Sequence, residues 1–132
     1  MKLGFIGTGN ISSDVVSGIS KSKINFKKII LSPRNKNKAI ILKKKYKKIL
    51  IAKNNQDVIN KSDWVFLGVL PNVGEKILPK LTFKKNQTII SFISTIKYLS
   101  LKKILKNDNI FRAIPMPPIS IGKGPIAIFP PN

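Results

Sequence analysis

Three closely spaced residues near the amino terminus could form a phosphate-binding turn. Gly7, Gly9 and Ser12 follow the strand-like residues 2–6 in a Gly-x-Gly-x-x-small pattern. The first glycine permits a tight turn, the second lets the backbone approach a pyrophosphate, and the third, small residue lets the following helix pack against the strand. That helix would point its N–H groups and its positive dipole end at the phosphates. The pattern predicts a dinucleotide site, with Ser12 as a departure from the usual Gly or Ala.

The loop after residues 29–31 predicts which dinucleotide would bind. In folds that bind NAD, an acidic residue after the second strand holds the ribose hydroxyls and would repel a 2′-phosphate. Here Ser32, Arg34 and Asn35 follow the strand without an acidic residue among them. Ser and Asn can donate hydrogen bonds, and Arg can pair with a phosphate through two N–H groups. We therefore predict a preference for NADP(H). The alternative is that Arg34 is a solvated loop residue and Asn35 a helix cap.

The rest of the composition offers little acid–base or metal chemistry. The chain has no His and no Cys, which excludes the commonest general base and a thiol nucleophile. The acidic residues are too dispersed in sequence to predict a metal cage, and we name no catalytic residue and no metal ligand: Asp14, Asp57, Asp63, Glu75 and Asp108. This composition suits a hydride-transferring enzyme, because a bound cofactor then carries the chemistry.

The net charge of +20 invites a nucleic-acid interpretation, and its densest part is the lysine cluster at residues 43–48. Lysine is nevertheless spread along the whole chain together with many Ile and Asn residues, which indicates a compositional bias. A basic helix end is the simpler explanation for the cluster, because lysines suit the dipole there. We expect no specific nucleic-acid partner, only non-specific binding of polyanions at low salt.

Apolar strands that alternate with helical segments predict the fold. Strands are expected at residues 2–6, 29–31, 49–51, 64–69, 88–92, 109–113 and 126–129, and helices after the glycine turn, at about 35–48 and at 55–61. This alternation is typical of a Rossmann-type α/β fold, with a doubly wound, mostly parallel sheet and helices on both faces. The length fits a single dinucleotide-binding domain over residues 1–132.

The spacing of apolar residues predicts which side of each helix faces the sheet. In the first helix we expect Ile11, Val15 and Ile19 on the inner side, and Ser12, Ser13 and Asp14 on the exposed side. In the basic helix, Ala39, Leu42 and Tyr46 are expected on the inner face. No stretch approaches the roughly 20 apolar residues of a membrane span, and the early apolar stretch is too short for a secretory signal. We expect a cytoplasmic protein that does not bind membranes.

Several segments together resemble the N-terminal, NADP-binding domain of the pyrroline-5-carboxylate reductase family. These segments are residues 4–11, 32–35, 55–58, 62–71, 91–96 and 112–118. The resemblance covers nearly the whole chain. It implies an NADP-dependent oxidoreductase that transfers hydride from NADPH to a cyclic imine, the last step of proline biosynthesis.

The resemblance also implies a set of cofactor-binding residues. In it Asn55 reaches the adenosine ribose, Val69 and Pro71 line the cofactor groove, and residues 91–95 and 115–118 frame the nicotinamide. The full set is Gly7, Thr8, Gly9, Asn10, Ile11, Ser32, Arg34, Asn35, Asn55, Val69, Leu70, Pro71, Ser94 and Thr95.

Two departures from the family pattern lie near the nicotinamide end. Met116 stands where the family has Asn, and Ser94-Thr95 replaces an Ala-Gly pair. They suggest an altered substrate or reduced activity, although loop hydroxyls often bond only to the backbone and Met usually packs in a core. The family's C-terminal helical domain, which builds the dimer and much of the substrate pocket, is expected to be absent from this chain. We therefore expect a homo-oligomer only in a full-length form, and this chain alone could be inactive.

Two other functions remain open on the sequence. One is another NADP-dependent oxidoreductase on the same scaffold, such as a deazaflavin-linked NADP reductase, which shares the early glycine turn. The other is a non-catalytic nucleotide-binding or basic interaction module. Cofactor titration separates the non-catalytic module from both oxidoreductases. Turnover of pyrroline-5-carboxylate separates the two oxidoreductases from each other.

Overall fold

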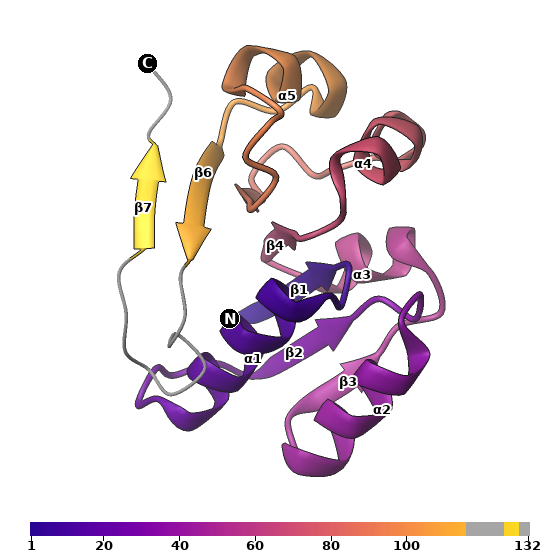
Figure 1. Cartoon of the computed structure of the whole chain (residues 1–132), viewed down its shortest axis with the longest axis vertical. Helices are drawn as coiled ribbons and strands as arrows, with labels where there is room; N and C mark the ends of the chain where they lie inside the picture. Colours follow the sequence, from indigo (N-terminus) through magenta and orange to yellow (C-terminus); the bar gives the residue numbers. More distant parts are fainter. Residues whose placement is uncertain (116–125, 130–132) are drawn as a thin grey trace.

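A single sheet forms the centre of the computed structural model, which describes residues 1–115 and 126–129. Its strands are β1 (Lys2–Ile6), β2 (Lys28–Leu31), β3 (Ile49–Ile51), β4 (Trp64–Leu67), β5 (Thr88–Ser91), β6 (Ile110–Pro115) and β7 (Ile126–Phe129). The strand order is β3-β2-β1-β4-β5-β6-β7 (Figure 1). The first six strands are parallel, and β7 pairs antiparallel with β6 at the edge.

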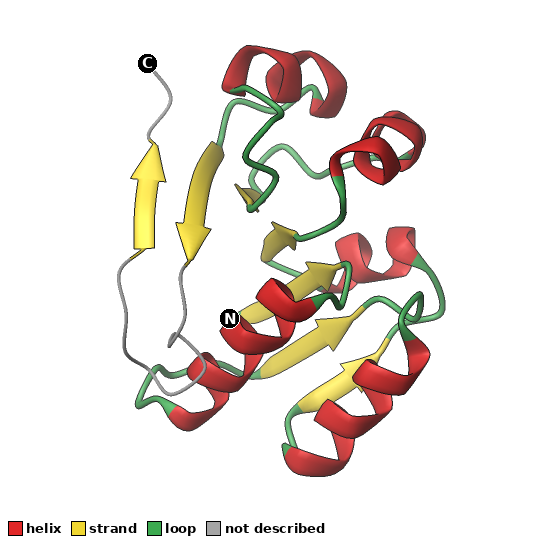
Figure 2. Ribbon diagram, in the orientation of Figure 1, coloured by secondary structure: helices red, strands yellow, loops and turns green. Residues whose placement is uncertain are grey.

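Helices cover both faces of this sheet (Figure 2). They are α1 (Asn10–Lys21), α2 (Lys36–Lys45), α3 (Asn55–Lys61), α4 (Pro71–Ile77), the 3₁₀ helix η1 (Leu78–Lys80) and α5 (Tyr98–Leu105). One apolar cluster joins α1 and α2 to the sheet, and a second joins α3, η1 and α5 to the opposite face. The predicted Rossmann-type fold, with a mostly parallel sheet between two helical layers, is confirmed.

The central strands are apolar along their length because both of their faces are covered. Ile29, Ile30 and Leu31 of β2 are all buried, and so are Val65, Phe66 and Leu67 of β4. Continuous apolar runs of this kind are typical of parallel strands between two layers of helices. The strand that was expected to reach residue 69 ends at Leu67, since the chain leaves the sheet at Gly68.

Neither α4 nor α5 was among the helices expected from the sequence. The helix α4 has only seven residues, and Gly74 is its sole buried residue, so it carries no apolar stripe. Its start is nevertheless marked by Pro71 at the first helical position, where the missing N–H group costs nothing. The helix α5 buries Leu101 and Leu105, one turn apart.

The expected orientation of α1 is wrong at its start. Ile11, expected on the inner side, is 39% exposed, whereas Ser12, expected on the exposed side, is completely buried. Val15 and Val16 form the buried face further along the helix. The helix turns Ser12 inward because Gly68 lies directly beneath it: a Cβ atom built on Gly68 would lie 2.0 Å from the Ser12 Oγ atom. The small third residue of the glycine motif thus packs against the end of β4.

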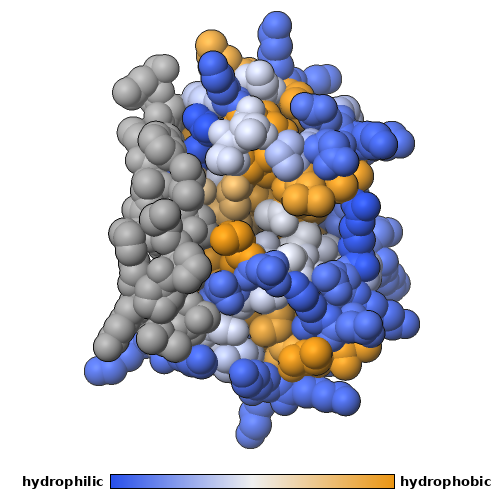
Figure 3. Space-filling view, viewed as in Figure 1, coloured by the Kyte–Doolittle hydropathy of each residue, from blue (hydrophilic) through white to orange (hydrophobic). Residues whose placement is uncertain are grey.

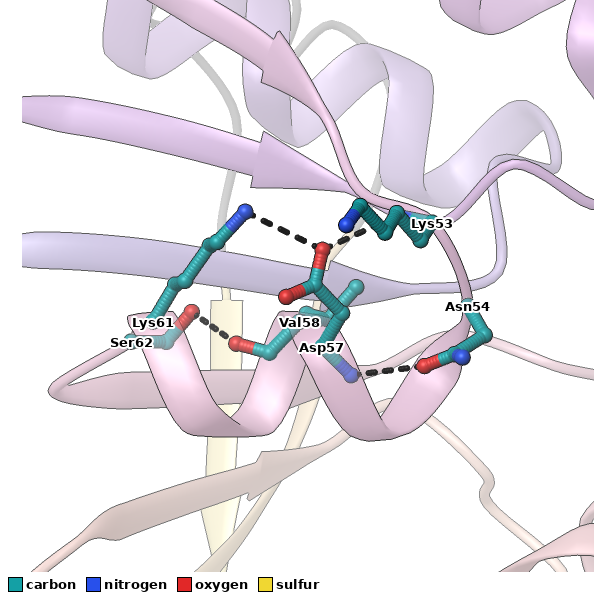
Figure 4. Close-up of polar contacts among 6 residues, drawn as sticks. All are labelled: Lys53, Asn54, Asp57, Val58, Lys61 and Ser62. Atoms are coloured by element: carbon teal, nitrogen blue, oxygen red, sulfur yellow. Dashed lines mark hydrogen bonds and ion pairs between the residues drawn. The ribbon is translucent and has the colours of Figure 1, made fainter.

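A set of local hydrogen bonds holds the first turn of α3 (Figure 4). The Asn54 side chain caps the helix by accepting a hydrogen bond from the Asp57 backbone N–H group at 2.8 Å. The Asp57 carboxylate accepts in return from the Lys53 backbone N–H group at 2.9 Å and forms an ion pair with Lys61 at 3.1 Å. The contact with Asn54 satisfies an N–H group that a helix start leaves unpaired, and the contact with Lys53 ties the residue before the cap to the helix.

An apolar groove of about 760 Å³ lies on the face of the sheet that carries α1. Its walls come from α1, the segment after it and the strands β4, β5 and β6, through residues that include Ile19, Ile24, Trp64, Phe66, Phe92 and Phe111. Figure 3 shows separate patches of apolar side chains at the centre and near the edges of this view, among many hydrophilic side chains. No helix among the described residues is long and apolar enough to cross a membrane.

Candidate nucleotide-binding site

A second cavity, of about 330 Å³, lies at the carboxyl ends of three neighbouring strands. It is lined by residues that follow β1 (Gly7, Thr8, Gly9), β2 (Arg34, Asn35) and β4 (Gly68, Val69, Leu70, Val73). The chain leaves β1 toward β2 on one side, and the later strands extend from β4 on the other. A crevice at this reversal of strand order is where open α/β sheets bind their ligands.

The turn after β1 depends on a glycine at position 7. Gly7 has a φ of +92°, in the left-handed region that favours glycine. A Cβ atom at this position would also lie 2.6 Å from the carbonyl oxygen of Gly68. The Gly7 N–H group donates a buried hydrogen bond to the Ser32 Oγ atom at 2.9 Å. The loop after β2 therefore holds the glycine turn in place.

The start of α1 faces the cavity without a capping side chain. Gly9 is the N-cap residue, its side chain position is open space, and its carbonyl accepts from the Ser13 N–H group at 2.9 Å. No acidic residue occupies the first turn. The first N–H groups of a helix lack partners within the helix and carry the positive end of its dipole. Together these features make a favourable place for an anion.

Buried hydroxyl groups beside this turn lack hydrogen-bond partners among the described residues. The Thr8 Oγ1 atom is one of them; Thr8 is 2% exposed and lines the cavity. The Ser12 Oγ atom, at the contact with Gly68, is another. Buried polar atoms are nearly always paired, so an unpaired one calls for an explanation. A phosphate oxygen in the cavity would accept from Thr8, and the residues present thus fit the diphosphate of a dinucleotide.

The opposite side of the cavity is basic. Arg34 and Asn35 line it, and Asn35 is the N-cap residue of α2. Asn35 thus occupies the cap position that the alternative predicted, but its side chain makes no capping hydrogen bond. No acidic residue lies in the first turn of α2 either. An anion in the cavity therefore meets a guanidinium and a second helix start.

The structure gathers only part of the predicted cofactor set around this cavity. Seven predicted residues line it: Gly7, Thr8, Gly9, Arg34, Asn35, Val69 and Leu70. Asn10 and Ile11 follow in the first turn of α1, and Ser32 is completely buried behind the glycine turn. Gly68 and Val73 line the cavity but were not in the predicted set. Gly68 has a sequence signal, a glycine directly after an apolar strand, whereas Val73 lies in a helix that the pattern did not predict.

Other predicted residues lie outside the lining. Asn55 is the first residue of α3, and Pro71 the first of α4. Ser94 and Thr95 are exposed in the turn after β5, and the Ser94 carbonyl accepts from the Arg112 Nη2 atom at 2.6 Å. This contact ties the turn after β5 to β6. Met116, and residues 117–118 with it, lie outside the described residues.

The described part of the chain shows no metal centre and two carboxylate–lysine ion pairs. No group of three or more His, Cys, Asp or Glu side chains lies close enough together within residues 1–115 and 126–129 to hold a metal ion. Asp57 pairs with Lys61, and Asp108 pairs with Lys102 at 3.1 Å. Lys53 and Lys61 lower the pKa of Asp57, and Asp108 raises the pKa of Lys102. Neither pair lines the cavity.

The chain is similar to known oxidoreductases along most of its length. A family model described as NADP oxidoreductase, coenzyme F420-dependent, matches residues 2–95. Pyrroline-5-carboxylate reductase 3 of Danio rerio is 27% identical over 132 residues, covering 97% of this chain and 45% of that protein. The chain spans about half the length of the curated relatives it matches.

Solved structures agree with this likeness. The 1-pyrroline-5-carboxylate reductase of Streptococcus pyogenes matches with a TM-score of 0.73 and 31% identity, over 87% of this chain and 42% of that one. The pyrroline carboxylate reductase of Plasmodium falciparum, solved with NADP bound, matches with a TM-score of 0.82 and 21% identity, over 98% of this chain and 47% of that one. At 21% identity, the likeness to the Plasmodium falciparum structure shows the fold alone. The predicted resemblance to pyrroline-5-carboxylate reductases is confirmed.

Proposed function

The chain belongs to the family described as NADP oxidoreductase, coenzyme F420-dependent, and from this premise we propose that it binds NADP(H) over the glycine turn as the cofactor-binding part of a reductase. One observation carries the proposal. The cavity at the reversal of strand order combines an uncapped helix start and an unpaired buried hydroxyl with a guanidinium. A diphosphate needs the first two features, and an additional phosphate needs the third.

In this proposal the pyrophosphate lies over Gly9. The N–H groups of Asn10 and Ile11, at the start of α1, donate to its oxygens, and so does the Thr8 hydroxyl. Gly9 fits this role because no side chain occupies the space toward the cavity. Val69 and Leu70 contribute an apolar wall on the β4 side.

The 2′-phosphate lies between the loop after β2 and the start of α2. Arg34 pairs with the phosphate, and the Asn35 amide, which makes no capping hydrogen bond, donates to it. Ser32 acts indirectly, because its hydroxyl oxygen already accepts from the Gly7 N–H group and thereby fixes the turn under the pyrophosphate. Asn55 at the start of α3 remains our candidate for the adenosine ribose.

The reaction we propose is hydride transfer to a cyclic imine, as in pyrroline-5-carboxylate reductases. The cofactor supplies the hydride, while the protein orients it against the imine carbon and excludes water. Support comes from the curated relatives, which carry that name and match 92% to 98% of this chain. Ser94, Thr95 and residues 115–118 are our candidates for the nicotinamide end. We further propose a cytoplasmic enzyme whose full-length form is a homo-oligomer.

A second candidate reaction is hydride exchange between NADP and a deazaflavin. It is favoured by one finding, the description of the matching family model. Both reactions use the same NADP site, so they differ only in the partner that takes up or gives the hydride. Turnover assays with pyrroline-5-carboxylate and with a reduced deazaflavin, each with NADP(H), separate the two.

Titration calorimetry with NADPH and NADH tests the cofactor assignment. We expect Arg34→Ala to weaken NADPH binding about tenfold or more, because a charge-assisted hydrogen bond contributes about 1.5–3 kcal/mol. NADH binding should stay nearly unchanged. Lys45→Ala, at the far end of α2, is the charge-matched control. Equal losses for both cofactors would refute the phosphate assignment, and no heat from either cofactor with the unaltered chain would refute the function.

A further inference from the structure

Lysines lie side by side at the amino ends of three neighbouring strands. Lys2 of β1 is in register with Lys28 of β2. Lys28 in turn lies opposite Lys48, because Ile29 and Ile49, the residues that follow them, are paired. Neighbouring strands are about 4.8 Å apart, so the three lysines form a row across the strands at that spacing.

Further lysines extend this row. The register of β2 and β3 places Lys27 beside Lys47, one residue before the first row. The helix α2 ends next to the start of β3 and carries residues 43–45 in its last turn (Figure 1). All of these lysines except the half-buried Lys28 are exposed. We call this surface the basic edge, and its residues are Lys2, Lys27, Lys28, Lys43, Lys44, Lys45, Lys47 and Lys48.

No ion pair within the described residues offsets the charge of the basic edge. The two carboxylate–lysine pairs found there involve Lys61 of α3 and Lys102 of α5. Asp63, next to the row, accepts a hydrogen bond from the Lys2 backbone N–H group at 2.8 Å. A helix end favours lysines, which accounts for residues 43–45. The row across the strands has no such explanation, because like charges on adjacent strands repel one another.

One ammonium group of the basic edge is already held in place. The Lys48 Nζ atom donates to the Phe26 carbonyl oxygen at 3.0 Å and lies 4.8 Å from the centroid of the Phe26 ring. An ammonium has three donors, so two remain for an anion. A side chain that is ordered before binding loses less conformational entropy when it binds. The basic edge therefore combines repelling cations with one cation that is preorganised.

We propose that the basic edge binds the phosphate backbone of a nucleic acid without reading its bases. Its rows of lysines suit the linear series of phosphates, which compact ammonium groups contact as point charges. A membrane is disfavoured, because membrane-binding surfaces combine cations with exposed aromatic or other large apolar side chains, and the aromatic residue of β1, β2 and β3, Phe5, is buried. The candidate cavity lies at the carboxyl ends of the strands, so this contact is separate from the proposed NADP(H) function.

A triple variant, Lys2→Gln/Lys27→Gln/Lys47→Gln, tests the proposal by fluorescence anisotropy with a labelled, mixed-sequence RNA of about 20 nucleotides. The unaltered chain should bind this RNA at about 0.15 M salt with a dissociation constant of about 1–100 µM. The triple variant should bind it about tenfold or more weakly. The slope of log affinity against log salt should fall by about 2, because each phosphate contact on a single strand contributes about 0.7. DNA of the same sequence should bind within about threefold of RNA, since both carry the phosphates.

A control variant removes the same charge elsewhere. Lys76→Gln/Lys80→Gln/Lys97→Gln changes three exposed lysines of α4, η1 and the residue before α5. It should weaken RNA binding by less than about threefold, because distant charges are largely screened at this salt concentration. Saturating NADPH should not displace the RNA, and both variants should bind NADPH within about twofold of the unaltered chain.

Thermal unfolding of each variant separates binding from folding. If the triple variant of the basic edge does not fold, Lys27→Gln/Lys47→Gln replaces it, and the slope should then fall by about 1.4. Neither side chain makes a hydrogen bond or ion pair with the described residues, so this double variant leaves the contacts of the fold intact.

Four outcomes would overturn the proposal. The first is that the unaltered chain does not bind RNA at about 0.15 M salt. Equal losses from the two triple variants would assign the binding to net charge alone, and displacement of RNA by NADPH would place the RNA in the cavity. If the basic-edge variant loses binding to phosphatidylserine vesicles but keeps RNA, the edge contacts membranes instead. Failure of the proposed function differs from all four, since the unaltered chain would then bind neither NADPH nor NADH.

Discussion

Single polar atoms connect the parts of the candidate site. The Ser32 hydroxyl was predicted as a possible donor to a phosphate, and in the structure its oxygen accepts from the Gly7 N–H group. This contact joins the loop that carries Arg34 to the turn that would hold the pyrophosphate. The two phosphate subsites of the proposed site are therefore mechanically linked. A shift of the basic loop would move the glycine turn with it.

Asp57 gives a pH-dependent prediction at the residue scale. The Lys53 N–H group and then the Lys61 ammonium lower the pKa of this carboxyl group below its usual value. A lowered pKa in the folded chain means that Asp57 contributes stability above its unfolded-state pKa and that this contribution is lost as the pH falls. Asp57→Asn should therefore unfold at a lower urea concentration than the unaltered chain at pH 7. The gap should close between about pH 5 and pH 2.

The control for this experiment is Lys61→Met, which removes the ion pair but leaves the hydrogen bond from the Lys53 N–H group. Its effect should be smaller than that of Asp57→Asn, since the hydrogen bond is the larger cause of the pKa shift. A gap of equal size at pH 7 and pH 3 would contradict the assignment of this stability to the charged form of Asp57.

At the scale of elements, the contact between α1 and the end of β4 sets how close the helix lies to the sheet. The Ser12 hydroxyl fills the space that Gly68 leaves free, and it has no hydrogen-bond partner among the described residues. Gly68→Ala should destabilise the chain by about 1–3 kcal/mol, because its methyl group would overlap the Ser12 Oγ atom. Ser12→Ala alone should be neutral or stabilising, since it removes an unpaired buried hydroxyl.

The double variant Ser12→Ala/Gly68→Ala should recover most of the lost stability. With the hydroxyl gone, the nearest Ser12 atom is Cβ, 3.4 Å from the added methyl group. Urea unfolding of the two single variants and the double variant gives the coupling energy between the sites. Additive effects would show that the destabilisation by Gly68→Ala arises elsewhere, for example from the contact with Phe92.

The sequence was most informative where one local rule determines the structure. Buried parallel strands are continuously apolar, so every strand of the sheet was expected, and the left-handed Gly7 turn follows from its motif. The side of α1 that faces the sheet was harder to predict. The spacing of Ile11, Val15 and Ile19 fits more than one rotation of the helix about its axis. Ser12 was therefore placed on the wrong side. Val73 could not be assigned to the cavity from the sequence, because its position depends on how α4 packs.

At the scale of the molecule, the two faces of the sheet are unevenly covered. The helices α3, η1 and α5 bury one face, whereas the groove beside α1 leaves apolar side chains of β4, β5 and β6 accessible on the other. The chain also spans about half the length of its curated relatives. Apolar surface of this extent on a folded chain binds other apolar molecules. The groove contains Trp64, the only tryptophan of the sequence, so an experiment can observe it directly.

An uncharged apolar dye such as prodan should bind this groove and quench the fluorescence of Trp64 by energy transfer. A neutral dye is required because the net charge of +20 would attract an anionic dye to the whole surface. Ile24→Ser should weaken dye binding by about threefold to tenfold, because it removes a large apolar side chain from the wall. Ile41→Ser is the matched control: Ile41 is 61% exposed on α2 and lies outside the groove, so dye binding should not change. Equal weakening by both substitutions, or quenching that persists unchanged in Ile24→Ser, would show that the dye binds elsewhere.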